Sequence, residues 1–255
     1  MKIGVPGCTG RVGGLIVEEL LSGRWDGLEL AGGTTRRPDD LQADYFVTAQ
    51  AEELFARSDV IIDFTTPEAG RAHIELAEAQ GKPLVLATTG FSAQDEQNIK
   101  TAAQKVPIVY AANTSIAVTM LDALVEYAAR ALGPEFDIEI VEAHHKHKVD
   151  APSGTALMLG KRAAKARGQN FENAAVLSRE GHTGARKDGE IGFSTIRGGD
   201  IVGEHTVYFI GEGERLELKQ QATNRALYAK GALRAALWVK DQPPGLYSMR
   251  DVLGL

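Results

Sequence analysis

The sequence predicts an α/β fold, in which a doubly wound parallel sheet is followed by a second α+β domain on a mixed or antiparallel sheet. Over the first 115 residues, short apolar runs alternate with helical patterns, as repeated strand–helix units require. A glycine motif follows the first of these runs. Beyond about residue 170, strand patterns follow one another directly and are separated by glycine-rich turns.

Composition narrows the class of protein before any motif is considered. The 255 residues suffice for one large domain or two smaller ones. A net charge of −6 argues against a broad nucleic-acid surface, which needs clustered basic residues. Cys8 is the single cysteine, so an intramolecular disulfide is impossible and a reducing compartment is favoured. No targeting pattern opens the sequence, and we expect a soluble, cytoplasmic protein.

The first part of the chain contains five expected strands and the helices between them. The helix after the first strand carries apolar residues at helical spacing from Val12 to Leu20. Thr66 and Pro67 form a helix start, and Gly81 is a suitable stop. Ser92 with Asp95 resembles a capping box for the next helix. The expected strands cover residues 3–5, 28–32, 59–64, 84–86 and 108–110.

The pattern changes after residue 115. An amphipathic helix is expected over 116–131, then an alternating strand from Phe136 to Ile140, then a helix over 155–167. Strands at 191–196, 202–209 and 215–221 are joined by Gly198–Asp200 and Gly211–Gly213, which have the composition of hairpin turns. A last helix over 227–239 leads to a short tail.

Gly7, Gly10 and Gly13 lie between the first strand and the first helix. Glycines at this point let a pyrophosphate approach the backbone N–H groups of a positive helix terminus, which makes the domain Rossmann-type. The spacing G-x-x-G-x-x-G differs from the commoner G-x-G-x-x-G, so an ordinary glycine turn remains the alternative. The small, polar ends of two later strands, residues 87–90 and 111–114, are expected on the same ligand-binding edge.

The end of the second strand distinguishes between the two nicotinamide cofactors. A site for NAD has an acidic side chain there, whereas this chain has Thr34, Thr35, Arg36 and Arg37. Guanidinium groups suit a 2′-phosphate, which favours NADPH. The alternative is that both arginines are solvated loop charges.

Three of the six histidines lie within residues 144–147, in the stretch 142–156 that also holds Lys146 and Lys148. A helix with Ser153, Gly154 and Thr155 at its start follows Pro152. A site that holds an anionic substrate and delivers a proton needs such donors, cations and open N–H groups together. His144 and His145 point in opposite directions if they lie on a strand, and spacing does not say which of them acts.

The whole pattern resembles the 4-hydroxy-tetrahydrodipicolinate (dihydrodipicolinate) reductase family. The resemblance covers nearly the full chain and rests on the glycine motif and five further segments: Ile62–Thr65, Thr88–Phe91, Glu142–Ala156, Ser178–Gly184 and Gly203–Thr206. It implies reduction of a cyclic dicarboxylate to tetrahydrodipicolinate with NADPH or NADH, in the diaminopimelate route to lysine. It also implies a dinucleotide-binding domain at 1–115 plus 226–255, a substrate and oligomerisation domain at 116–225, and a homotetramer.

The resemblance implies roles at individual positions. His144 is expected to be the general acid, and Lys148 its cationic partner. The expected substrate ligands are His145, Ser153, Gly154, Thr155, Thr89 and Arg225. The expected cofactor contacts are Gly7, Cys8, Thr9, Gly10, Arg11, Val12, Thr35, Arg36, Ala87, Thr88, Thr89, Ala111, Ala112, Asn113 and Thr114. Lys146 and His147 have no expected role beyond structure or solvation.

Two positions depart from the family pattern. Thr35 and Arg36 stand where an acidic residue is frequent, which favours NADPH over NADH, and Ala87 replaces a usual glycine. Three other functions remain open. A metal hydrolase is disfavoured because the lysines beside the histidines repel a cation. An NADP-sensing protein leaves the His/Lys cluster unexplained, and a reductase of a related dicarboxylate is the third.

Overall fold

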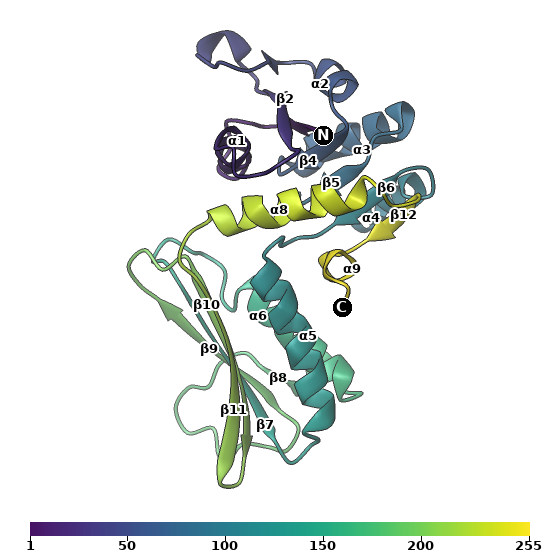
Figure 1. The fold of residues 1–255 in the computed structure, drawn as a ribbon. Coiled ribbons are helices and arrows are strands. Elements are labelled where there is room, and N and C mark those ends of the chain that lie inside the picture. The colour runs from purple at the N-terminus through teal and green to yellow at the C-terminus, as the bar shows by residue number, and fades with distance from the viewer. The chain divides into compact units, whose positions relative to one another are not determined.

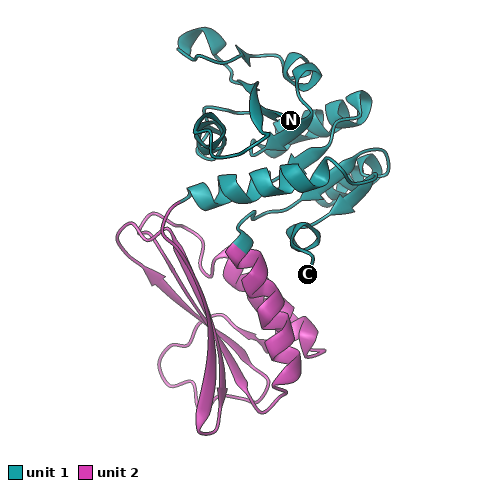
Figure 2. Ribbon diagram, in the orientation of Figure 1, with its two compact units in different colours: residues 1–116, 225–255 teal, residues 117–224 magenta.

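The computed structural model describes all 255 residues, which form two compact units (Figure 2). Unit 1 comprises Met1–Ile116 and Arg225–Leu255, and unit 2 comprises Ala117–Asn224. Each boundary lies one residue from the expected position. The functional assignment of each unit, to cofactor or to substrate and subunit contacts, stays a prediction.

Unit 1 is built on a seven-stranded sheet in which all paired strands are parallel (Figure 1). The order is β12-β6-β5-β4-β1-β2-β3, so the chain reverses direction across the sheet at β1. This is the doubly wound order of dinucleotide-binding folds with one strand added, which confirms the predicted fold class. The strands are β1 (Lys2–Val5), β2 (Glu29–Thr34), β3 (Val47–Thr48), β4 (Val60–Asp63), β5 (Leu84–Leu86), β6 (Pro107–Tyr110) and β12 (Gly245–Tyr247).

Helices cover both faces of this sheet, and alternate residues of each strand point to opposite faces. On β4, Ile62 belongs to a core shared with α1 and α8, whereas Ile61 belongs to a second core with α2, α3 and α4. Burial on both faces explains why the strands are continuous apolar runs. The helices are α1 (Gly13–Leu21), α2 (Ala51–Arg57), α3 (Pro67–Gln80), α4 (Ala93–Ala102), α8 (Ala226–Val239) and α9 (Met249–Leu253), with a short 3-10 turn at Pro38–Asp40.

The predicted helix ends of unit 1 are confirmed by their caps. The Thr66 hydroxyl accepts a hydrogen bond from the N–H of Ala69 at the start of α3, and Gly81 ends that helix in the left-handed conformation. Ser92 and Asp95 form the reciprocal capping box of α4. None of the helices has the length and apolar character needed to cross a membrane.

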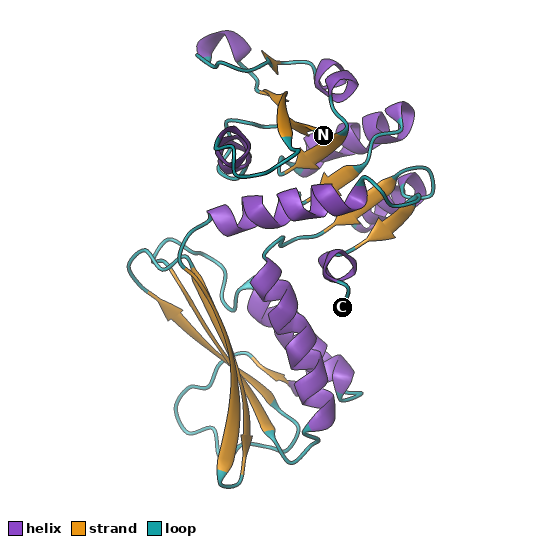
Figure 3. Ribbon diagram, in the orientation of Figure 1, coloured by secondary structure: helices purple, strands orange, loops and turns teal.

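Unit 2 contains a mixed five-stranded sheet in the order β11-β10-β7-β9-β8, as the fold class predicted. Its helices lie along one face, and the other face carries no helix (Figure 3). The strands are β7 (Asp137–His144), β8 (Ala175–Val176), β9 (Ile191–Arg197), β10 (Gly203–Gly211) and β11 (Glu214–Ala222). The helices are α5 (Ile116–Ala131), α6 (Gly154–Ala166) and α7 (Phe171–Ala174).

One of the two expected hairpins is wrong. Gly211–Gly213 joins the antiparallel pair β10 and β11, as predicted. Gly198–Asp200 does not join a pair, because β7 lies between β9 and β10. β7 pairs in parallel with β9 and antiparallel with β10. The glycines turn the chain, but the core face of β7 determines which strands become neighbours.

The remaining differences concern short elements. Four short elements, β3, α2, α7 and β8, were not predicted; they have two to seven residues each. The expected tail instead adds β12 beside β6 and ends in α9. Ser248 and Asp251 form a capping box at the start of α9. Such short elements are stabilised by tertiary contacts more than by their own sequence.

Candidate active site

The site in unit 2 continues the core face of β7. Ile138 and Ile140 are fully buried on that face, and Glu142 and His144 follow at the same two-residue spacing. The register places His205 of β10 opposite Glu142 on one side and Arg197 of β9 opposite His144 on the other. The apolar core therefore changes into a cluster of titratable groups at the end of the strand.

Glu142 is the centre of that cluster. Its side chain is 1% exposed, and its Oε2 lies 2.6 Å from Nδ1 of His144. Arg197 donates to both carboxylate oxygens, at 2.8 Å each. Burial raises the pKa of Glu142, but the hydrogen bonds from Arg197 and His144 outweigh it, and the net pKa is lowered. Glu142 is therefore an ionised carboxylate at neutral pH.

Ser153 links this cluster to α6, at which it is the N-cap. Its hydroxyl accepts from the N–H of Ala156 and lies 3.0 Å from Nε2 of His205. Its own N–H donates to Oε1 of Glu142 at 3.0 Å. Burial, followed by the charge of His144, lowers the pKa of His205 from 6.5 to about 4. His205 is therefore neutral at pH 7.

The other members of the His/Lys stretch differ in exposure. Lys146 and His147 are exposed. His145 is half-buried, with its ring centroid 6.2 Å from that of His147. Lys148 Nζ forms an ion pair with Asp150 at 2.8 Å, which lowers the pKa of that carboxyl group. No group of three His, Cys, Asp or Glu side chains is arranged to hold a metal ion.

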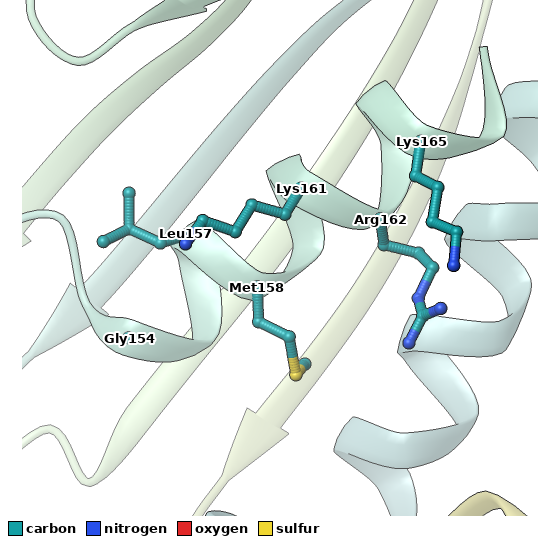
Figure 4. A pocket seen from close by; sticks show the side chains of 6 residues that line it. All are labelled: Gly154, Leu157, Met158, Lys161, Arg162 and Lys165. Atoms are coloured by element: carbon teal, nitrogen blue, oxygen red, sulfur yellow. The ribbon is translucent and has the colours of Figure 1, made fainter. Parts of the chain in front are cut away.

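The start of α6 is open toward solvent. A side chain built at Gly154 would meet no atom within 4 Å, and Thr155 follows in the first turn, half-buried. A groove of about 400 Å³ runs from Gly154 along this helix (Figure 4). Its further lining residues are Leu157, Met158, Lys161, Arg162 and Lys165. Lys161 and Lys165 add to the positive potential along this helix, whereas Arg162 is paired with Asp122 and Glu126.

The glycine turn in unit 1 fits a dinucleotide. Gly7 has φ +65°, and a Cβ at Gly13 would lie 2.2 Å from the carbonyl oxygen of Gly7. Only glycine permits this close approach of turn and helix. The start of α1 at Val12 has no side-chain cap and no acidic residue in its first turn. The N–H of Gly14 already donates to the carbonyl of Gly10, but the positive end of the helix dipole faces this turn and can interact with an anion such as a pyrophosphate.

The end of β2 lies against this turn. The hydroxyls of Thr9 and Thr35 are 3.3 Å apart, and both Arg11 and Arg36 are exposed. Arg37 pairs loosely with Asp40, at 3.8 Å. Arg36 is therefore the guanidinium that follows Thr35 without a carboxylate partner in the structure.

The side chain of Cys8 does not face the ligand side of the glycine turn but packs against the end of β2. Its thiol donates to the carbonyl of Thr34 at 3.3 Å, and burial raises its pKa. A cofactor contact at Cys8 would therefore use its backbone.

Two of the expected cofactor residues have hydroxyls that are already engaged. Thr88 donates to the buried carboxylate of Asp63 at 3.2 Å, and Thr114 donates to the carbonyl of Tyr228 at 2.8 Å. Cofactor contacts at these positions would use the backbone. The neighbouring segments differ: Thr89 and Ala112 are exposed, whereas Ala87 and Ala111 are held in the sheet by backbone hydrogen bonds. The Asn113 side chain accepts from the N–H of Ser115.

Asp63 holds the ends of β4 and β5 together. It is fully buried and accepts from the N–H and hydroxyl of Thr65 as well as from Thr88. Its second oxygen lies 2.7 Å from Nδ1 of His73 on α3. This network fixes the loops at the carboxyl edge of the sheet, where the doubly wound fold binds ligands.

The expected site residues thus fall into two groups. Unit 2 contains His144, Lys148, His145, Ser153, Gly154 and Thr155. Unit 1 holds the expected cofactor residues, together with Thr89 and Arg225, which is exposed at the start of α8. No catalytic or binding role was predicted for Glu142, Arg197 or His205. The two-residue alternation along β7 was a usable signal for Glu142, since it continues the core face.

Comparison with known proteins identifies the family. Family models described as dihydrodipicolinate reductase match residues 1–114 (N-terminus) and 117–253 (C-terminus). A 4-hydroxy-tetrahydrodipicolinate reductase of Magnetococcus marinus is 48% identical over 264 residues, covering 100% of this chain and 98% of the relative. One from Zymomonas mobilis is also 48% identical, with the same coverage.

A solved structure agrees with these relatives. The dipicolinate-bound dihydrodipicolinate reductase from Paenisporosarcina sp. TG-14 superposes with a TM-score of 0.80 at 25% identity, over 97% of both chains. Both halves of the sequence, the full-length relatives and the fold lead to the same assignment. The chain belongs to the dihydrodipicolinate reductase family.

Proposed function

We propose that the chain carries out the reaction of its family with His144 as the proton donor. As a member of the family it is an oxidoreductase that uses a pyridine nucleotide and reduces 4-hydroxy-tetrahydrodipicolinate to tetrahydrodipicolinate in lysine biosynthesis. The observation that carries the proposal is the 2.6 Å contact between His144 and a buried carboxylate, beside the open start of α6. It supports a proton donor and an anion site in one cluster.

The substrate is a ring with two carboxylates, and unit 2 offers partners for both. One carboxylate binds at the first turn of α6, where Gly154 and Thr155 present backbone N–H groups to an anion. Ser153, as the N-cap, fixes the position of that turn. The other carboxylate is bound by Lys148 and His145. The Asp150 partner of Lys148 has a side chain that is 53% exposed, and such pairs are weak enough to be exchanged.

The 4-hydroxyl group leaves as water together with a proton from the adjacent ring carbon. The hydride then adds at the carbon that carried the hydroxyl group, and a proton from Nε2 of His144 adds at the adjacent carbon. The bound nucleotide supplies that hydride. Lys148 stays charged throughout and stabilises the negative charge that develops on the ring before the proton arrives. Afterwards His144 is neutral, with its remaining proton on Nδ1, and it is recharged from solvent. Its side chain is 12% exposed, which permits that exchange.

NADPH is the preferred cofactor in this proposal, and NADH is accepted. The contact between Thr9 and Thr35 supports it, because it brings the end of β2 to the pyrophosphate-binding turn. Arg36 follows directly and binds the 2′-phosphate. The residues assigned here to cofactor binding are Gly7, Cys8, Thr9, Gly10, Arg11, Val12, Thr35, Arg36, Ala87, Thr88, Thr89, Ala111, Ala112, Asn113 and Thr114.

The helix-free face of the unit 2 sheet is the proposed contact for a homotetramer. Ile196 of β9 and Ile210 of β10 are 52% and 37% exposed there. Apolar side chains on an open sheet face indicate an interaction surface. Light scattering after gel filtration tests this, and a monomeric mass contradicts it. A cytoplasmic location also remains a proposal, in keeping with the single cysteine.

A coupled assay tests the function. The substrate is supplied by the synthase that makes it, and the oxidation of NADPH and of NADH is followed. His144→Gln is expected to lower kcat by at least about 100-fold, since general acids contribute that much or more, while the Kd of NADPH stays unchanged. His147→Gln, at an exposed position of the same stretch, is the matched control. An unchanged kcat in His144→Gln removes it as the acid.

The same assay separates the other functions. No oxidation of NADPH, with intact NADPH binding, would indicate a sensor instead of an enzyme. Oxidation with another cyclic dicarboxylate but not with this substrate would indicate a related reductase.

A further inference from the structure

Glu142 has no place in the proton transfer itself, yet it has the most hydrogen bonds in the cluster. Its two carboxylate oxygens accept hydrogen bonds from four neighbouring residues. Oε1 accepts from the Ser153 N–H, from Arg197 and, at 3.4 Å, from the Thr195 hydroxyl. Oε2 accepts from Arg197 and His144. A carboxylate with this many donors is held in one orientation.

The charge on Glu142 determines which nitrogen of His144 carries a proton. An ionised carboxylate only accepts hydrogen bonds, so the proton in the 2.6 Å contact belongs to Nδ1 of His144. Nε2 is then the atom that gains and loses a proton. A Cβ at Gly203 would lie 3.1 Å from that Nε2, so the absence of a side chain keeps the atom accessible.

The same carboxylate fixes α6. The Ser153 N–H, which precedes the helix, donates to Oε1, while the Ser153 hydroxyl caps the helix and contacts His205. A displacement of Glu142 would therefore move the acid and the start of α6 together. Arg197 secures Glu142 and also donates to the carbonyl of Asp150, in the loop that leads to α6.

We propose that Glu142 is a positioning residue, held in place by Arg197. It keeps the proton of neutral His144 on Nδ1, so that proton transfer uses Nε2, and it fixes the position of His144 relative to the start of α6. The proposal rests on the proposed function of His144 as the acid. The titratable groups that contact His144 are Glu142 and His205. Arg197 is bound to Glu142, and Lys148 is paired with Asp150 in the loop that follows.

The first test reads the tautomer of His144 directly. The imidazole ¹⁵N shifts of the labelled wild-type protein are measured at a pH where His144 is neutral, and the resonance is assigned by its loss in His144→Gln. The expected result is a proton on Nδ1. A proton on Nε2 in the neutral form overturns the proposal. This measurement needs no variant at Glu142, so it holds even if such a variant fails to fold.

The second test replaces the carboxylate by an amide of the same shape. In Glu142→Gln the amide oxygen takes the position of Oε1, because Ser153, Arg197 and Thr195 all donate there. The NH₂ group then lies at the position of Oε2, where it loses the hydrogen bond from Nη1 of Arg197 and donates to Nδ1 of His144. The neutral His144 is expected to change to the Nε2–H tautomer, and an unchanged tautomer contradicts the proposal.

The kinetic result separates positioning from binding. Glu142→Gln is expected to lower kcat by about 100-fold, within the range of general acid catalysis, and to change KM by less than about threefold, since the Ser153 contact remains. Glu139→Gln is the matched control: Glu139 also lies on β7 and is bound by two arginines, Arg179 and Arg186, without contacting a histidine. It is expected to retain its kcat and the wild-type tautomer of His144.

Two further outcomes distinguish this inference from the proposed function. A tautomer that changes as expected while kcat stays at the wild-type value supports the positioning of His144 but removes His144 as the acid. Equal losses of kcat in Glu142→Gln and Glu139→Gln, with the tautomer unchanged in both, overturn the positioning role and leave the acid role intact.

Discussion

The buried imidazole of His205 makes the stability of unit 2 depend on pH. In the folded protein its pKa is about 4, because it is desolvated and lies beside the positive charges of His144 and Lys148; Gln220 and Glu142 oppose this only in part. In the unfolded chain the pKa is near 6.5. Between these values the unfolded state binds more protons, so stability is complete above pH 6.5 and is lost as the pH falls.

The size of the effect follows from the two pKa values. Between the two pKa values, each fall of one pH unit lowers the free energy of unfolding by up to about 1.4 kcal/mol. The loss from pH 6.5 to pH 4.5 is therefore about 2 kcal/mol. Glu142, whose pKa is lowered, also destabilises the fold on protonation, but only at pH values below its ordinary range near 4.5. Measurements at and above pH 4.5 therefore report mainly His205.

Hydrogen exchange of the β10 amides provides the assay, since it reports opening of unit 2 without a two-state assumption for the whole chain. The opening free energy is compared at pH 6.5, 5.5 and 4.5 for the wild type and for His205→Gln. The wild type should lose about 2 kcal/mol more than the variant over this range. His182→Gln, an exposed histidine of the same unit, should behave like the wild type. Equal losses of opening free energy in the wild type and in His205→Gln would mean that His205 is not the group that makes unit 2 sensitive to pH.

Three further predictions concern charge and packing. Lys148→Ala is expected to lower kcat and raise the substrate KM, each by about tenfold or more, because a charged contact is lost both to the bound substrate and to the transition state. Unchanged kinetics in the coupled assay would count against a role for Lys148. Arg36→Glu should shift the ratio of kcat/KM for NADPH over NADH by at least about tenfold toward NADH, and a constant ratio would mean that Arg36 does not bind the phosphate. Gly231→Ala places a Cβ 1.8 Å from the Thr114 carbonyl oxygen, so it should destabilise unit 1 by about 1–3 kcal/mol in a thermal melt, and an unchanged Tm contradicts the close packing of α8 against Thr114.

Local signals in the sequence predicted most of the fold. The apolar runs of β4 and β5, the caps at Thr66 and Ser92 and the alternation of β7 all depend on residues close in sequence. The pairing of β9 with β7, in contrast, depends on which apolar faces meet across the sheet. A glycine-rich turn after β9 therefore suggested a hairpin that does not form.

In the candidate site, too, the features that depend on residues close in sequence were predicted, and those that depend on distant residues were not. The histidines, the lysines and the start of α6 are adjacent in sequence, so their chemistry was visible as a cluster. Arg197 reaches Glu142 across 55 residues, and His205 reaches Ser153 across 52. Nothing in the local pattern connects such partners. The charge state of Glu142 depends on them, and so does the tautomer inferred for His144.

A crystal structure with NADPH and pyridine-2,6-dicarboxylate would show directly whether His144 and the start of α6 act on the same ligand. We expect one carboxylate of the inhibitor on the N–H groups of Gly154 and Thr155 and the other at Lys148. Nε2 of His144 should be directed at the ring while Nδ1 stays on Glu142. An inhibitor bound with the His144 imidazole turned away from the ring, or held without contact to the start of α6, would contradict it.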